Sequence, residues 1–212
     1  MFLLQICKDG VLRYNFVMDT KNILRNSTKV IRNSFEKAYI SKVSDVIVQN
    51  IKEWTCYKQA RNIMLFYPFK SELSLLKLLE DTSKNFYFPV VDGNEMYPVK
   101  YDKKLGFKTG QFGISEPAGE KFESYQSFDL IFTPALSVDR AGYRIGYGKG
   151  FYDKFFAKIK TETIKIVPVF SRFFIDSIHP DKHDIPVDYI VTEKGICHAI
   201  RKSEDDLVCR HP

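Results

Sequence analysis

The first strongly patterned stretch of the chain runs from Asp19 to about Trp54. Its apolar residues recur at helical spacing among polar ones, at Ile23, Val30, Ile31, Phe35, Val43, Ile47 and Ile51. A period of 3.6 residues is typical of amphipathic helices that cover a hydrophobic core. The sequence therefore predicts one broken helix or two successive helices in this region.

Short apolar runs and amphipathic segments alternate along the rest of the chain. The run from Asn62 to Tyr67 is closed by Pro68 and predicts a strand. Ser71 to Asp81 then predicts a helix with Ser71 as its N-cap. Further strands are predicted at Phe86 to Val91, Tyr97 to Tyr101, Asp129 to Thr133, Thr163 to Phe170 and Tyr189 to Thr192, and helices near residues 150–159 and 172–178.

This alternation of strands and helices predicts the fold class. Strands that alternate with helices are typical of α/β proteins, whose largely parallel sheets are covered on both faces. We therefore expect a single three-layer α/β domain with a mostly parallel or mixed sheet and helices on both faces. Such sheets bind ligands at the carboxyl ends of their strands. The glycine-rich stretch from Gly106 to Gly119 is expected to be a loop.

The composition fits one folded domain. The chain has 212 residues, of which 44% are hydrophobic and 27% are charged, so it can bury a sizeable apolar core. Met18 is followed directly by a clean helix start. We therefore expect residues 18–212 to form the domain and residues 1–17 to be an N-terminal extension.

The cysteines and the N-terminal residues indicate the compartment. The four cysteines are widely separated and form no C-x-x-C pair, which argues against a zinc ribbon and against a disulfide framework. The apolar stretch from Met1 to Cys7 is too short for a signal sequence or a membrane span. We therefore expect a cytoplasmic protein with reduced thiols and no membrane partner.

The net charge of +6 favours anionic partners, which include nucleic acid, acidic membrane surfaces and phosphate-rich small molecules. The lysines and arginines are spread along the whole chain without a dense run. This spread argues against nucleic acid. Small phosphorylated molecules remain the better match.

The most informative segment is Asp139 to Asp153, DRAGYRIGYGKGFYD, because four glycines fall within nine of its residues. Backbone without Cβ atoms can approach a ligand closely and turn successive N–H groups toward an anion. Arg144 and Lys149 add cationic side chains beside those amides. A strand precedes the segment and a helix pattern follows it, so the sequence predicts a phosphate-binding loop. Its glycines are Gly142, Gly146, Gly148 and Gly150.

The segment departs from the two common phosphate-binding motifs. In G-x-x-x-x-G-K-[ST] the lysine is followed by Ser or Thr, whereas Lys149 is followed by Gly150. In G-x-G-x-x-G the third glycine would fall at Phe151. A glycine-rich turn between a strand and a helix, without a ligand, is the alternative that the pattern alone leaves open.

The segment resembles the signature of the 5-formyltetrahydrofolate cyclo-ligases, also called methenyltetrahydrofolate synthetases. In that family a strand ending near a proline leads into F-D-R-x-G-x-R-x-G-x-G-x-G-[FY]-Y-D. Val138 replaces the usual Phe, Tyr147 stands where many relatives carry Arg, and Phe151 stands where Tyr is common. The matching positions are Pro134, Asp139, Arg140, Gly142, Arg144, Gly146, Gly148, Gly150, Tyr152 and Asp153.

Three further segments match the family in the same order, and the resemblance spans roughly residues 18–195. They are the helix K-x-x-L-R from Lys21 to Arg25, the run YPFKSE from Tyr67 to Glu72, and DIPVD from Asp184 to Asp188. On residue pattern alone, the first would be a solvated helix face, and Glu72 an ordinary carboxylate in the first turn of a helix.

The resemblance assigns a role to each candidate residue. Lys149 and Arg144 would act in catalysis, and Asp153 and Asp188 would hold Mg²⁺, which usually takes one or two protein carboxylates. The residues implied for ATP are Lys21, Arg25, Arg144, Gly146, Gly148, Lys149, Gly150, Phe151 and Tyr152. The residues implied for the folate are Tyr67, Glu72, Tyr147, Gly148, Lys149, Gly150 and Phe151.

The reaction that the resemblance implies converts 5-formyltetrahydrofolate into 5,10-methenyltetrahydrofolate, with ATP consumed and ADP and phosphate released. The expected partners are therefore small molecules, and we expect a monomer. A non-catalytic nucleotide- or RNA-binding domain of the same fold is the main alternative. A sugar-phosphate isomerase of related architecture is another, and it would not need ATP. A metal site at His179 and His183 is less favoured than a polar loop.

Overall fold

The centre of the protein is a seven-stranded mixed sheet. The structure, a computed structural model, describes residues 5–6, 12–13, 20–110 and 113–200. Five inner strands of the sheet are parallel, and both edge strands are antiparallel to their neighbours. The strands, in spatial order, are β14 (Gly195–His198), β13 (Tyr189–Thr192), β11 (Ile164–Pro168), β8 (Leu130–Phe132), β3 (Asn62–Met64), β4 (Asn85–Asp92) and β5 (Glu95–Lys100).

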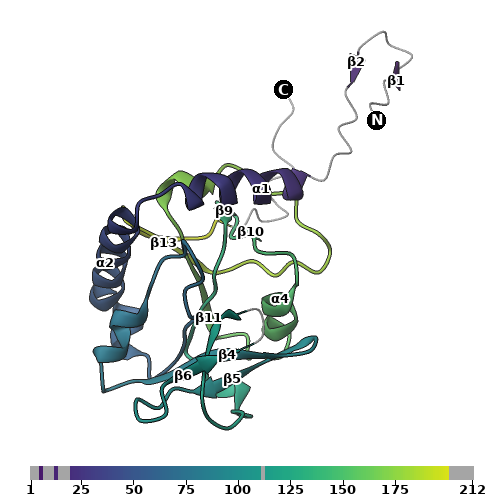
Figure 1. The fold of residues 1–212 in the computed structure, drawn as a ribbon. Helices are drawn as coiled ribbons and strands as arrows, with labels where there is room; N and C mark the ends of the chain where they lie inside the picture. Colours follow the sequence, from purple (N-terminus) through teal and green to yellow (C-terminus); the bar gives the residue numbers. More distant parts are fainter. Residues whose placement is uncertain (1–4, 7–11, 14–19, 111–112, 201–212) are drawn as a thin grey trace.

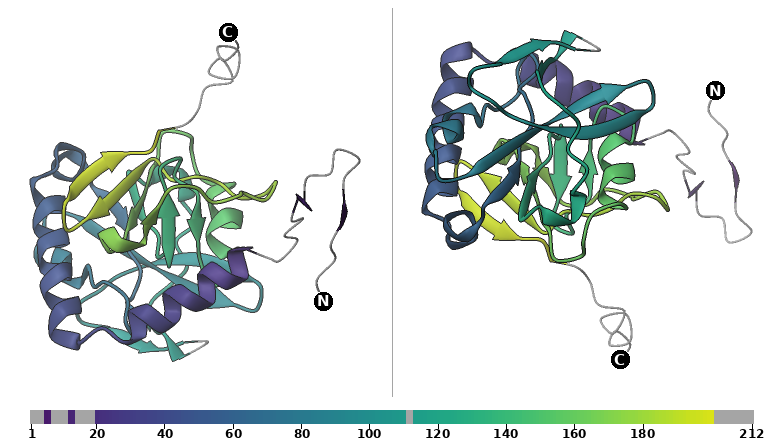
Figure 2. Two further views of the ribbon diagram at one scale, coloured as in Figure 1. Left: turned by 90° about the horizontal axis from the view of Figure 1, so that it is seen from above. Right: turned by 90° about the horizontal axis from the view of Figure 1, so that it is seen from below.

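Helices cover both sides of this sheet. Helix α2 lies on one side and the short helix α4 on the other, while α1 runs across one end of the molecule (Figures 1 and 2). The arrangement confirms the predicted α/β fold with a mixed sheet and with helices on both faces. The α-helices are α1 (Thr20–Asn33), α2 (Lys37–Glu53), α3 (Thr55–Gln59) and α4 (Phe151–Phe156), and the 3-10 helices are η1 (Leu76–Glu80), η3 (Tyr125–Ser127) and η4 (Ser171–Phe173).

Smaller β-structures surround the main sheet. A three-stranded sheet has the order β10-β9-β12, and β6 and β7 form an antiparallel pair, as do β1 and β2. The predicted boundary between residues 17 and 18 lies outside the described residues and stays a prediction. The bounds are β9 (Ser137–Asp139), β10 (Arg144–Ile145), β12 (Phe174–Ile175), β6 (Phe107–Thr109), β7 (Ser115–Pro117), β1 (Gln5–Ile6) and β2 (Leu12–Arg13).

The core follows from the apolar runs of the sequence. All three residues of β8 are buried, as expected for a parallel strand covered on both faces. Helix α2 contributes Ile47 and Ile51, which are completely buried, so the helical period seen in the sequence marks its core face. Each such side chain stabilises the fold by about 1.5–3 kcal/mol through burial. Phe128 and Phe155 bring aromatic rings to the same core.

The helix predicted from Ser71 to Asp81 is wrong. Only Leu76–Glu80 is helical, as a 3-10 helix, and the preceding backbone turns at Lys70, which has a positive φ of 55°. Ser71 does not cap a helix, because its hydroxyl donates to Asn33 Oδ1 at 2.7 Å and accepts from Arg32 at 3.2 Å. Contacts with the end of α1 therefore override the helical pattern of this segment.

Two other expectations are also corrected. The segment 172–178 is not a helix: after η4 it enters β12, where Phe174 pairs with Val138. The stretch from Gly106 to Gly119 is not an irregular loop, because β6 and β7 pair within it. At Phe174 the partner strand is distant in the sequence, whereas β6 and β7 are neighbouring strands that pair as a local hairpin.

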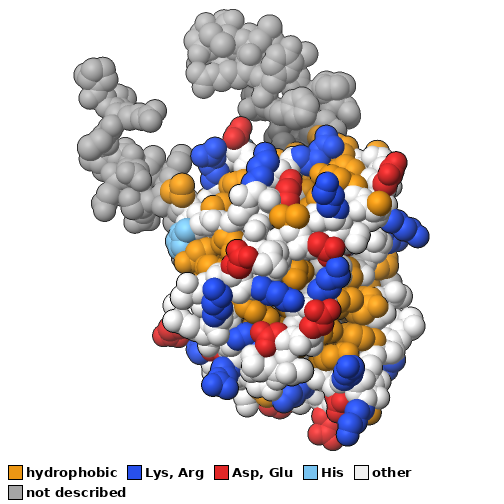
Figure 3. All heavy atoms as spheres, turned by 90° about the vertical axis from the view of Figure 1, so that its left-hand side faces the viewer, with side chains coloured by type: hydrophobic (Ala, Val, Ile, Leu, Met, Phe, Trp, Pro, Cys, Tyr) orange, Lys and Arg blue, Asp and Glu red, His pale blue; other side chains and the backbone are white. Residues whose placement is uncertain are grey.

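The surface carries both signs of charge. On the side of the molecule that α2 covers, basic and acidic side chains are interspersed without a continuous basic area (Figure 3). Within the described residues, no helix is long and apolar enough to cross a membrane.

Candidate active site

A cavity of about 530 Å³ opens where the parallel strands end. This volume is in the usual range for small-molecule sites. The site lies at the carboxyl ends of β3 and β8, as the fold class predicts. Its lining residues come from α1, from the ends of β3 and β8, from β4, β5 and β7, and from the glycine-rich loop: Lys21, Arg25, Phe66, Tyr67, Phe69, Glu72, Pro89, Val91, Met96, Ile114, Ser115, Glu116, Thr133, Pro134, residues 144–153, Asp181 and Asp184.

The base of the glycine-rich loop is fixed by Asp139. Its buried carboxylate accepts from the backbone N–H groups of Ala141 and Tyr143 at 3.0 and 2.9 Å, and from that of Ile178 at 2.8 Å. Gly142 has a φ of 85°, and a Cβ atom there would lie 2.3 Å from the carbonyl oxygen of Val187. Only glycine fits this close approach. The loop is therefore tied to the chain segment that precedes β13.

Helix α1 holds the loop from the other side. Arg25 Nε donates to the carbonyl oxygen of Gly146 at 2.9 Å, and its guanidinium group lies against Gly148. Lys21 Nζ donates to Asp181 at 2.7 Å and to Asp184 at 2.5 Å. Burial alone would lower the pKa of Lys21, but these two carboxylates outweigh it and raise the pKa. The same lysine holds the pKa of Asp184 below its usual range, against the effect of burial. The two predicted cations on α1 thus anchor the loop and the 181–184 segment.

Arg144 and Asp153 form a partly buried ion pair beside the loop. Arg144 donates to Asp153 Oδ1 at 2.8 Å and to the carbonyl oxygen of Ile185 at 2.6 Å, and its guanidinium lies over the ring of Phe156. The backbone N–H of Ile185 also donates to Asp153. Burial lowers the pKa of Arg144, and the charge of Asp153 opposes this shift. Arg144 thereby fixes the start of α4 relative to the 184–185 segment.

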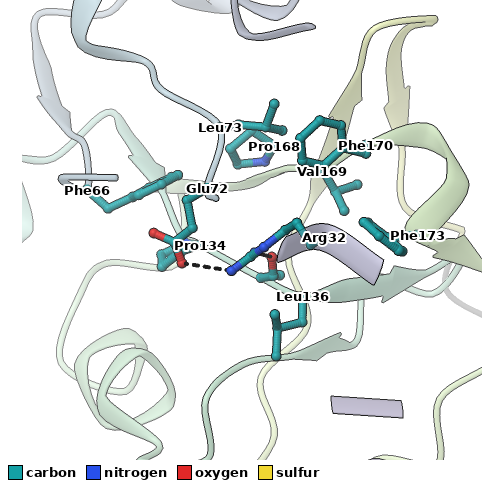
Figure 4. A pocket seen from close by; sticks show the side chains of 11 residues that line it. Arg32, Phe66, Glu72, Leu73, Pro134, Leu136, Pro168, Val169, Phe170 and Phe173 are labelled. Atoms are coloured by element: carbon teal, nitrogen blue, oxygen red, sulfur yellow. Dashed lines mark hydrogen bonds and ion pairs between the residues drawn. The ribbon is translucent and has the colours of Figure 1, made fainter. Parts of the chain in front are cut away.

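Glu72 and Arg32 form a second pair, which is buried. Glu72 accepts from the backbone N–H of Phe69 at 2.9 Å, and Arg32 of α1 approaches it to 3.9 Å (Figure 4). Arg32 also donates to the hydroxyl of Tyr147. Burial raises the pKa of Glu72, and the Phe69 amide, Arg32 and the Tyr147 hydroxyl only partly offset this. Burial and the charge of Glu72 raise the pKa of Tyr147 to about 12. A cavity of about 10 Å³ adjoins this pair, near the lower limit for a water molecule.

Thirteen of the fourteen residues predicted for the site line this one cavity. The exception is Asp188, whose Oδ2 lies 2.8 Å from Lys165 Nζ and accepts from the Lys165 backbone N–H. Asp188 stands at the amino end of β13, whereas the cavity lies at the carboxyl ends of the strands. The residues brought together are Lys21, Arg25, Tyr67, Glu72, Arg144, Gly146, Tyr147, Gly148, Lys149, Gly150, Phe151, Tyr152 and Asp153.

Sequence reasoning missed several charged residues of the site, among them Arg32 and Asp184. Arg32 lies seven residues after Arg25, hence on the same face of α1, and this spacing could have marked it. Asp184 is the first residue of the DIPVD segment and lines the cavity. Asp188, the aspartate of that segment that was predicted for the site, does not. No group of three or more potential metal-ligating side chains gathers in the described parts of the chain.

Fold and cavity together define an α/β protein with a small-molecule site at the carboxyl ends of its strands. The family model described as "5-formyltetrahydrofolate cyclo-ligase family" matches residues 17–193. The chain belongs to that family.

Two relatives that carry the name 5-formyltetrahydrofolate cyclo-ligase show the extent of the similarity. The mouse protein is 33% identical over 165 residues, which are 70% of this chain and 81% of that protein. The Haemophilus influenzae protein is 28% identical over 139 residues, which are 62% and 74% of the two chains. The solved structure of an Aquifex aeolicus 5,10-methenyltetrahydrofolate synthetase matches with a TM-score of 0.77 at 29% identity, covering 87% of this chain and 95% of that one.

Proposed function

We propose that the protein closes 5-formyltetrahydrofolate into 5,10-methenyltetrahydrofolate at the expense of ATP. The observation that carries the proposal is the pairing of two unlike walls in one cavity. One wall holds the glycine-rich loop with Lys21, Arg25 and Lys149, and the other holds Tyr67 and Glu72. A phosphate chain and a folate can therefore meet in one site.

The chemistry needs positioning more than it needs a protein nucleophile. The formyl oxygen on N5 of the folate attacks the γ-phosphorus of ATP, and ADP leaves. N10 then closes the ring as phosphate departs. The protein holds the oxygen and the phosphorus in line and neutralises the charge of the transferring group. Lys149 and the loop amides supply fixed donors for this charge. Arg144 holds the glycine-rich loop against the first turn of α4 through its ion pair with Asp153.

We propose Mg²⁺ as the ion that accompanies ATP, held by Asp153 and Asp184. Both carboxylates line the cavity, and Ile185, next to Asp184, donates its backbone N–H to Asp153. A hard cation that keeps several waters and takes one or two carboxylates fits this donor set. When bound, the ion would neutralise phosphate charge. Asp184 takes the place of Asp188 in this proposal because Asp184 lines the cavity and Asp188 does not.

The metal proposal predicts different outcomes for neighbouring carboxylates. Asp184→Asn should raise the Mg²⁺ concentration needed for half-maximal turnover by roughly tenfold, the loss typical of a removed metal ligand or its orienting partner. Asp188→Asn should leave this concentration unchanged. Asp181→Asn is the matched control, because Asp181 also pairs with Lys21 but has a largely exposed side chain. Equal effects of the three substitutions in a Mg²⁺ titration would contradict the assignment.

The reaction itself is tested by incubating the purified protein with 5-formyltetrahydrofolate and Mg-ATP. The methenyl product has extended conjugation, so absorbance should rise in the near ultraviolet, and ATP should be required. Omission of ATP, omission of Mg²⁺ and the 10-formyl isomer are the controls. A folded protein that binds nucleotide but gives no absorbance change would instead support a non-catalytic binding domain.

We further propose that the protein works in the cytoplasm, where ATP is present and thiols stay reduced. The two cysteines in the described part of the chain, Cys56 and Cys197, are free thiols, which supports a reducing compartment. A monomer remains our prediction for the oligomeric state, and size-exclusion chromatography with light scattering measures it directly.

A further inference from the structure

Two hydroxyl groups in the wall of the cavity have no hydrogen-bond partner within the described residues. They are Oγ1 of Thr133 and the phenolic OH of Tyr152. Both atoms are shielded from solvent, and both residues line the cavity. Thr133 has an exposed fraction of 0%. Buried polar groups are nearly always paired, and one left unpaired is costly. An unpaired pair of hydroxyls in a ligand cavity therefore points to partners on the ligand.

Their position identifies the wall to which they belong. Thr133 directly follows β8, whose neighbour β3 leads into Phe66 and Tyr67. Thr133 therefore lies at the strand ends that carry the Tyr67 to Glu72 segment. Tyr152 comes from the first turn of α4. Thr133 thus belongs to the wall that carries Tyr67 and Glu72, and Tyr152 lines the same cavity.

The chemistry of the two hydroxyls sets the hydrogen bonds that they can form. The phenolic hydroxyl of Tyr152 can donate and accept. Thr133 can both donate and accept. Nearby apolar side chains, among them Val91 and Met96, would cover the faces of a flat ring whose edge meets these hydroxyls.

We propose that the hydroxyls of Thr133 and Tyr152 hydrogen bond to the folate and determine its selection. The inference rests on the proposed function, because it deepens the role of the same cavity. The bicyclic ring of a folate carries N–H donors and nitrogen and oxygen acceptors along one edge, which a phenol and a threonine hydroxyl in the same cavity can match. A site built to hydrogen bond a polar edge discriminates strongly, since an unmatched ligand leaves the protein groups unpaired.

The decisive variant is Thr133→Val, which removes the hydroxyl and keeps the branched shape. Replacing an unpaired buried hydroxyl by an apolar group of the same shape is neutral or stabilising. We expect the melting temperature of the ligand-free protein to stay the same or rise by about 1–3 °C. The Kd for 5-formyltetrahydrofolate, measured by calorimetry, should rise about five- to tenfold. Affinity for ADP should not change.

Thr163→Val is the matched control. Thr163 is also buried, but its hydroxyl donates to the carbonyl oxygen of Phe128 at 2.9 Å, and it does not line the cavity. This variant should lose melting temperature and keep the parent affinity for the folate. Tyr152→Phe should repeat the Thr133→Val pattern, with weaker folate binding and no loss of stability.

Three outcomes would overturn the inference. In the first, Thr133→Val lowers the melting temperature and leaves folate affinity unchanged, which means that the hydroxyl has a structural partner. In the second, ADP affinity falls and folate affinity does not, which assigns the hydroxyls to the nucleotide. In the third, the parent protein does not bind the folate at all. A parent that binds the folate without turning it over contradicts only the proposed function, because the variant affinities still test the hydroxyls.

Discussion

Lys149→Met is expected to lower kcat by roughly 10²–10³, the effect of removing one fixed donor to a transition-state charge. Lys149 is exposed and lines the cavity between Gly148 and Gly150, so its ammonium group can reach the transferring phosphoryl group. The fold should be unaffected, because an exposed lysine contributes little to stability. Steady-state kinetics with saturating folate and Mg-ATP measure the effect.

Lys154→Met is the control for this experiment. Lys154 lies five residues further on, in α4, and is also exposed, but it does not line the cavity. The Lys154→Met substitution removes the same charge from the same region and should leave kcat within about twofold of the parent. If both variants lose activity equally, the effect is one of net charge. If Lys149→Met keeps the parent rate, Lys149 takes no part in the chemistry.

Gly142→Ala should lower the stability of the protein by about 3 kcal/mol or more. Two costs combine: the positive φ of 85° is strained for alanine, and its Cβ would lie 2.3 Å from the backbone oxygen of Val187. Backbone cannot move aside as a side chain can. In a domain of this size the melting temperature should fall by roughly 6–12 °C, measurable by scanning calorimetry.

Alanine substitutions at two other glycines separate the cost of the positive φ from the cost of the steric contact. Gly93 has a positive φ of 57° but open space around its Cβ position, so Gly93→Ala carries only the conformational cost, about 1–2 kcal/mol. At Gly146 there is also open space and no positive φ, so Gly146→Ala should not lower the melting temperature. A Gly142→Ala variant no less stable than Gly93→Ala would contradict the close approach to Val187.

The sequence predicted the main sheet well because its strands are marked by their own apolar residues. β8 and β13 lie within or at the predicted bounds, and α1 and α2 follow the helical period. The failures occur where distant contacts decide. At Ser71 the helical pattern is real, but the hydroxyl bonds to Asn33 and Arg32 at the end of α1 instead of capping a helix. Nothing local in the sequence carries that information.

The site residues were predicted mainly from sequence motifs. The prediction is therefore accurate where a motif is long and contiguous, and weaker where it is short. The contiguous glycine-rich segment could be placed residue by residue, and every residue within it that was assigned to ATP, folate or Mg²⁺ lines the cavity. DIPVD is short and has an aspartate at each end, so the sequence alone did not separate Asp184 from Asp188. Arg32 belongs to no motif, and its importance comes from two contacts with residues 40 and 115 positions away.

Helix α1 has a consequence for the order in which the protein is built. Its residues Lys21, Arg25 and Arg32 hold partners that lie 160, 121 and 115 positions further along the chain. Contacts between residues so far apart stabilise the chain only after the entropy of a long loop has been lost. During synthesis α1 is therefore made more than a hundred residues before its partners. Until the glycine-rich loop has been made, the basic residues of α1 cannot form these contacts. Nucleotide and folate can consequently stabilise only the completed domain, and cannot guide its earlier folding.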